Sequence, residues 1–117
     1  LKGYLMLAER LYSDGPDFAE AWNFGPDDSD NGSVELVANK FARCWGEKFR
    51  YSIDSDAQPH EASFLKLDCS KAKSKLGWYP SWDLDNALEA TAEWYQAWMN
   101  KSNMRKFTEQ QINNHFE

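Results

Sequence analysis

The chain has 117 residues, of which 42% are apolar and 15% aromatic, and its formal net charge is −6. This length and composition indicate one folded domain and exclude a disordered chain. The negative charge argues against a nucleic-acid partner, because phosphate binding needs clustered lysine and arginine. No stretch is long and apolar enough for a membrane span, so we expect neither a membrane partner nor a signal peptide.

The first part of the chain predicts a helix followed by a short strand. Apolar residues recur at helical spacing over residues 1–11, and the turn cluster SDGP follows them. The stretch EAWNFGP then alternates, with Trp22 and Phe24 on one face and Asn23 on the other. Because the chain starts without a methionine and already in helical register, we expect it to be part of a longer protein.

The middle of the chain predicts a second helix and two further strands. Ser33 is placed to cap a helix whose apolar stripe runs to Trp45 and closes at Gly46. The stretches KFRYSI (48–53) and FLKLD (64–68) are typical of short strands, and an irregular loop separates them.

The last part predicts three helices. Asp68 is placed to cap the helix CSKAKSKL, which ends at Gly77, and Asp83 to cap the longest helix. A short final helix is predicted to start at Thr108, because TEQQ has the form of a capping box. Helices alternating with strands predict an α/β fold, a small sheet of few short strands covered by helices, as a single domain over residues 1–117.

The residues provide no catalytic set of their own. The six glycines never form a phosphate-binding loop, and no tyrosine is followed four residues later by lysine. Two histidines and two separated cysteines do not make a metal site. Cys44 and Cys69 are expected to be free thiols, which favours the reducing cytoplasm. The residues alone therefore indicate a binding or accessory domain, with no catalytic residue and no metal ligand.

Several motifs resemble a known superfamily. AWNFGP, followed by a capped helix ending in Trp-Gly, resembles a strand and helix of the extended short-chain dehydrogenase/reductases that act on nucleotide sugars. LKLDCSKAKSKLGWYPSWDLDNALEATAEWY resembles the C-terminal segment of those enzymes. GYLMLAERLY, QPHEA with LKLD, and MRKFTEQQI look closest to the CDP-glucose 4,6-dehydratase family. The resemblance covers almost the whole chain.

This resemblance implies that two domains have different roles in the full-length enzyme. In such enzymes an N-terminal Rossmann domain holds NAD and the catalytic residues, and a smaller C-terminal domain binds the nucleotide sugar. The present chain would be that C-terminal substrate-binding domain, and it would bind no NAD by itself. The implied partners are CDP-glucose and the protein's own Rossmann domain, and the full-length enzyme is expected to be a homo-oligomer.

Three residues match positions that approach the substrate in related enzymes. Asn23 is expected to bond the ribose or phosphate, although it could instead cap the turn at Gly25. His60 and Glu61 match a His-acid pair near the nucleotide, since an imidazole can donate to phosphate and a carboxylate can accept from ribose hydroxyls. The alternative is a solvated loop pair. Related dTDP-sugar enzymes have an arginine after this pair, where the present chain has alanine and serine.

Other features are expected to be structural. The lysines of KAKSK are interpreted as a solvated helix face, Trp94, Tyr95 and Trp98 of the longest helix as packing residues, and His115 as part of a frayed tail. Two other functions stay open. The chain could be a free-standing dehydratase-like interaction module, or the same domain of another nucleotide-sugar dehydratase or epimerase. A gene that encodes a Gly-rich loop and a Tyr-x-x-x-Lys upstream would favour the enzyme.

Overall fold

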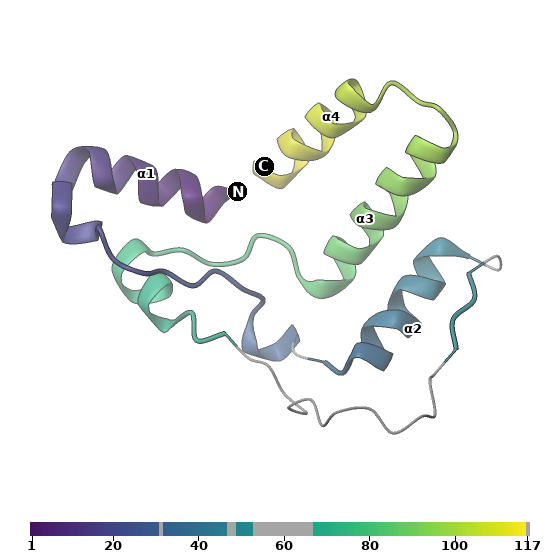
Figure 1. Ribbon diagram of the computed structural model, residues 1–117, viewed down its shortest axis with the longest axis horizontal. Coiled ribbons are helices and arrows are strands. Elements are labelled where there is room, and N and C mark those ends of the chain that lie inside the picture. Colours follow the sequence, from purple (N-terminus) through teal and green to yellow (C-terminus); the bar gives the residue numbers. More distant parts are fainter. Residues whose placement is uncertain (31, 47–48, 53–66, 117) are drawn as a thin grey trace.

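The computed structural model describes residues 1–30, 32–46, 49–52 and 67–116, and every regular element in these ranges is helical (Figure 1). In chain order they are the helix α1 (Lys2–Asp14), the short 3₁₀-helices η1 (Gly15–Phe18) and η2 (Asp28–Asp30), α2 (Val34–Trp45), the short π-helix η3 (Ala72–Leu76), α3 (Leu84–Met99) and α4 (Met104–Phe116).

The predicted α/β fold is wrong for the described residues, which contain no strand. The alternation in EAWNFGP is present, because Trp22 and Phe24 are half-buried and Asn23 is exposed. The two rings do not face a sheet, however. Phe24 packs edge-on against Trp78 at 5.0 Å, and Trp22 stacks on Phe18 at 5.9 Å between ring centroids. The pattern of a half-buried strand is thus met by an extended segment lying against helical neighbours.

The second predicted strand is also absent from the described residues, for a similar reason. Of residues 48–53 the structure describes 49–52, and these pack on α2 rather than on a neighbouring strand. Phe49 contacts Phe41 at 5.4 Å between ring centroids, and the Tyr51 hydroxyl donates to Asn39 Oδ1 at 2.7 Å. Of the third predicted strand, only residues 67 and 68 lie within the described residues, and they are not in a strand.

The predicted helix boundaries are confirmed where a capping residue sets them. Ser33 Oγ accepts from the Leu36 amide at 3.2 Å, and Asp83 Oδ1 accepts from the Asn86 amide at 2.8 Å. Gly77 ends the helical turn after Asp68 with a φ of 65°, a left-handed conformation that other residues adopt at a cost. This turn directs Trp78 back into the core.

The last helix starts earlier than predicted. α4 begins at Met104, and Asn103 caps it through its Oδ1, which accepts from the Lys106 amide at 3.2 Å. Thr108 lies inside the helix, where its Oγ1 accepts from Trp94 Nε1 at 3.0 Å. The hydroxyl expected to form a capping box therefore joins α4 to α3.

The elements are arranged as two packed groups. In one, α1 packs against η1 and η3; in the other, α3 packs against both α2 and α4 (Figure 1). The largest buried cluster lies in the first group: Cys69, Ala72, Leu76 and Trp78, with Met6, Leu7, Phe18, Trp22 and Phe24 packed against it. The start of α1 and the end of α4 meet, since Leu1 and Phe116 line the same cavity.

The molecule is a thin slab of 50 × 42 × 21 Å, about two helix diameters thick. Many large apolar side chains are exposed on it, including Tyr12 at 95% and Trp98 at 58%. The expectation that the tryptophans of α3 are packing residues is therefore wrong for Trp98. None of the helices described is long and apolar enough to cross a membrane.

Candidate functional site

The candidate site is built around Asn23, the one predicted site residue that the structure describes. Asn23 lies on the extended segment after η1, and its exposed side chain donates through Nδ2 to the Asp68 carbonyl at 3.2 Å. The bond joins residues that are 45 positions apart. His60 and Glu61 lie outside the described residues, so the structure does not test whether the three predicted residues meet.

On the C-terminal side of Asn23, Gly25 lies beside the side chains of Leu67 and Cys69. A Cβ atom built on Gly25 would lie 3.4 Å from Leu67 Cβ and 3.5 Å from Cys69 Sγ. The segment with Asn23 therefore runs against residues 67–69. Cys69 is buried in this contact and Cys44 is exposed on α2, and both thiols are free, as predicted.

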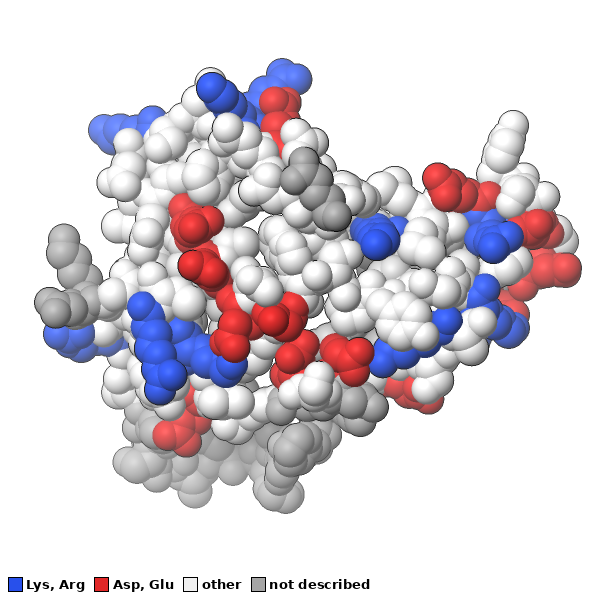
Figure 2. Space-filling view, turned by 180° about the vertical axis from the view of Figure 1, so that it is seen from behind, with Lys and Arg blue, Asp and Glu red and all other residues white. Residues whose placement is uncertain are grey.

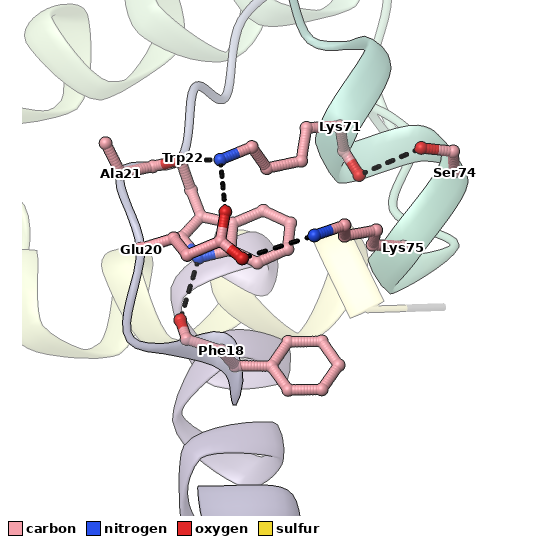
Figure 3. Close-up of polar contacts among 7 residues, drawn as sticks. All are labelled: Phe18, Glu20, Ala21, Trp22, Lys71, Ser74 and Lys75. Carbon is pink, nitrogen blue, oxygen red and sulfur yellow. Dashed lines mark hydrogen bonds and ion pairs between the residues drawn. The ribbon is translucent and has the colours of Figure 1, made fainter. Parts of the chain in front are cut away.

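A lysine fixes the segment on the N-terminal side of Asn23 (Figure 3). Lys71 Nζ lies 2.7 Å from Glu20 Oε2 and donates to the Ala21 carbonyl at 3.0 Å. It also lies 5.3 Å from the centre of the Trp22 ring, within the range of a cation–π contact. Lys75 Nζ approaches the other oxygen of Glu20 at 3.2 Å.

Lys71 and Lys75 together shift the pKa of the Glu20 carboxyl. Hydrogen bonds from Lys71 and then Lys75, together with the charges of both lysines, hold the pKa of the Glu20 carboxyl below its ordinary value. The third lysine of this turn, Lys73, pairs with Asp27 at 3.4 Å. The interpretation of KAKSK as a solvated face is therefore incomplete, because all three lysines bind acidic side chains of residues 20–27.

Charge on the molecular surface is mixed. On the face shown in Figure 2, acidic and basic side chains are interspersed, with no continuous basic field. On this face the pattern agrees with the net charge of −6.

A second feature was missed by the sequence analysis. A cavity of about 260 Å³ lies where α4 meets the chain start, lined by Leu1, Trp82, Thr108, Gln111, Ile112, His115 and Phe116. An adjoining cavity of about 220 Å³ shares Leu1, Trp82 and His115. The sequence contains a signal for the α4 side of this cavity, because four of its lining residues recur at the spacing of one helix face: Thr108, Gln111, Ile112 and His115.

His115 is packed rather than frayed. Its ring lies 4.7 Å from the Trp82 ring in an edge-on contact, and its Nδ1 is buried without a hydrogen-bond partner among the described residues. Burial lowers the pKa of His115, and the positive charge of Lys2 lowers it further. The prediction that His115 belongs to a frayed tail is wrong.

The starts of two described helices are already occupied by the chain's own acceptors and charges. A dinucleotide needs free amide groups at a helix start, whereas the starts of α2 and α3 are capped by Ser33 and Asp83 and carry Glu35 and Asp85 in their first turns. Within the described ranges there is also no group of three or more histidine, cysteine or acidic residues placed to bind a metal.

The sequence has a curated relative that matches over nearly all of this chain. It is 41% identical over 115 residues, which are 98% of the chain, to CDP-glucose 4,6-dehydratase of Salmonella typhimurium (strain LT2). The chain spans only 32% of the length of that relative. No family model matches the chain. The resemblance predicted from the motifs is confirmed: the chain is similar, from end to end, to about a third of a CDP-glucose 4,6-dehydratase.

Proposed function

We propose that this chain is the C-terminal, nucleotide-sugar-binding part of an NAD-dependent CDP-glucose 4,6-dehydratase. The observation that supports the proposal is the 41% identity to such an enzyme over 98% of the chain. The lack of a cofactor-binding loop in the chain fits this assignment, because NAD and the catalytic residues would then belong to the remaining two thirds of the longer protein.

In this proposal the chain binds the nucleotide end of CDP-glucose. Asn23 can accept a hydrogen bond through Oδ1, since its Nδ2 already donates to the Asp68 carbonyl. His60 would donate to a phosphate or ribose oxygen, and Glu61 would accept from ribose hydroxyls. The longer protein would act in the cytoplasm as a homo-oligomer, and the free thiols of Cys44 and Cys69 are compatible with a reducing compartment.

The test is the substitution Glu61→Ala in the full-length protein. A hydrogen bond to a charged group contributes roughly 1.5–3 kcal/mol, so the KM for CDP-glucose should rise by about ten- to a hundredfold. The KM for NAD should not change, because the cofactor would bind to the other domain. Steady-state kinetics with each substrate varied, beside a thermal melt of the same variant, measure these effects.

The matched control is Glu89→Ala, which removes an exposed carboxylate of α3 and should leave both KM values unchanged. An unchanged KM for CDP-glucose in the Glu61→Ala variant would exclude Glu61 from the substrate site. Competition by CDP-glucose, dTDP-glucose and GDP-mannose distinguishes the proposed substrate from those of related nucleotide-sugar enzymes.

A further inference from the structure

The segments 20–23 and 68–71 are tied together by side-chain bonds in both directions. From one side, Lys71 Nζ donates to the Ala21 carbonyl at 3.0 Å; from the other, Asn23 Nδ2 donates to the Asp68 carbonyl at 3.2 Å. Two antiparallel strands would exchange backbone bonds at such a place. Here two side chains provide the bonds, so the relative position of the segments depends on those side chains.

Lys71 contacts three consecutive residues directly before Asn23. Its ammonium binds the Glu20 carboxylate and the Ala21 carbonyl, and it lies 5.3 Å from the Trp22 ring centre (Figure 3). An ammonium group has three N–H donors, and two of them point to these protein oxygens. Lys71 therefore uses two of its three donors to hold the chain.

Its neighbours in the same turn do not share this geometry. Lys75 reaches Glu20 at 3.2 Å, and its side chain is 55% exposed, compared with 40% for Lys71. Lys73 pairs with Asp27, beyond Asn23 in the sequence. Of the three lysines, Lys71 alone bonds a backbone atom of the segment that leads into Asn23, and this makes Lys75 a matched comparator.

Asn23 thus lies between two contacts of its segment. Lys71 holds residues 20–22 before it, and Gly25 lies beside the side chains of Leu67 and Cys69 after it. We propose that Lys71 is a positioning residue of the nucleotide-sugar site, which sets the backbone path that places Asn23 against the substrate. This role rests on the proposed function of Asn23, and Lys71 itself touches no substrate.

The test is Lys71→Met in the full-length protein, alone and combined with Asn23→Ala. Misplacing the proposed hydrogen bond between Asn23 and the substrate should raise the KM for CDP-glucose about three- to tenfold. The kcat and the KM for NAD should change little. If Lys71 acts through Asn23, the double variant should have the KM of Asn23→Ala alone. Lys71→Arg, which keeps a charged donor, should restore the wild-type value, and Lys75→Met should leave it unchanged.

Lys71→Gln, whose shorter side chain cannot reach both partners, replaces Lys71→Met if the latter does not fold, and the same rise in KM is expected from it. An unchanged KM, or effects of Lys71→Met and Asn23→Ala that multiply in the double variant, would overturn the positioning role while leaving the proposed function intact. Failure of the unsubstituted protein to bind CDP-glucose would instead remove the proposed function, and with it this role of Lys71.

Discussion

At the scale of single residues, Lys71 and Glu20 join parts of the chain that are 51 positions apart. Solvent screens an exposed ion pair of this kind, so its charge contributes little to stability. Because the folded-state pKa of Glu20 is depressed, the stabilisation is present above the ordinary pKa of glutamate. It is lost as the pH falls through the folded-state value.

His115 gives a second pH effect, which can be measured separately. Its pKa is lower in the folded chain than the ordinary 6.5. Below about pH 6.5 the unfolded chain therefore binds the proton more tightly than the folded chain does, and the free energy of unfolding should decrease as the pH is lowered. The loss should level off below the folded-state pKa of His115.

Urea denaturation at pH 7.5 and pH 5 measures this effect, with His115→Gln as the comparison. The variant should lose less stability over this interval than the unsubstituted chain, because the contributions of all other groups are common to both. Equal losses in the two proteins would contradict the assigned burial of His115 against Trp82.

Only part of the site could be predicted from residues. Asn23 was identified from its motif, and its exposure next to two half-buried rings follows from the alternation in the sequence. The pairing of Lys71 with Glu20 was not predicted, because nothing local to either residue specifies a partner 51 positions away. The packing of His115 had a local signal in the helical spacing of its neighbours, but its partner Trp82 lies outside α4.

At the scale of elements, α3 is the helix that connects the second packed group. It contacts α2 through the ion pair of Lys40 with Asp85 and the bond from Gln96 Nε2 to the Trp45 carbonyl. It contacts α4 through Gln111 Nε2, which donates to the Ala90 carbonyl at 2.8 Å. Stability of this group therefore depends on the formation of α3.

The cap of α3 provides a direct test. Asp83→Ala removes the acceptor of the Asn86 amide and a negative charge at the helix start, so it should lower the free energy of unfolding by about 0.5–2 kcal/mol. Glu89→Ala, which removes an exposed carboxylate inside the same helix, should change it by less than about 0.5 kcal/mol. Thermal or urea unfolding measures both variants, and equal effects would show that the cap is not the cause.

The predictions for elements succeeded where the signal is local and failed where it is not. Caps and glycine ends depend on neighbouring residues, which is why Ser33, Asp83 and Gly77 were assigned correctly. Strands require a partner from elsewhere in the chain, and an alternating pattern is equally satisfied by packing on helices. The start of α4 was misplaced because Asn103, a strong N-cap, precedes the capping-box pattern at Thr108.

At the scale of the whole molecule, the chain is extended and poorly buried. Its radius of gyration is 17.6 Å, compared with about 13 Å for a compact domain of this length. The exposed apolar side chains of α1 include Tyr4, Leu5, Leu11 and Tyr12. Exposed apolar surface of this kind marks an interaction site. We propose that the rest of a longer protein covers this surface, because the chain spans only 32% of the length of the curated relative.

We propose that this chain supplies the substrate-binding part of a CDP-glucose 4,6-dehydratase and that the catalytic residues lie in the rest of the longer protein. The direct measurement is the conversion of CDP-glucose to its 4-keto-6-deoxy product, followed by NMR in the presence of NAD. The longer protein should convert the substrate, and the 117-residue chain alone should convert none at any concentration. Turnover by the chain alone, or no conversion by the longer protein, would contradict the claim.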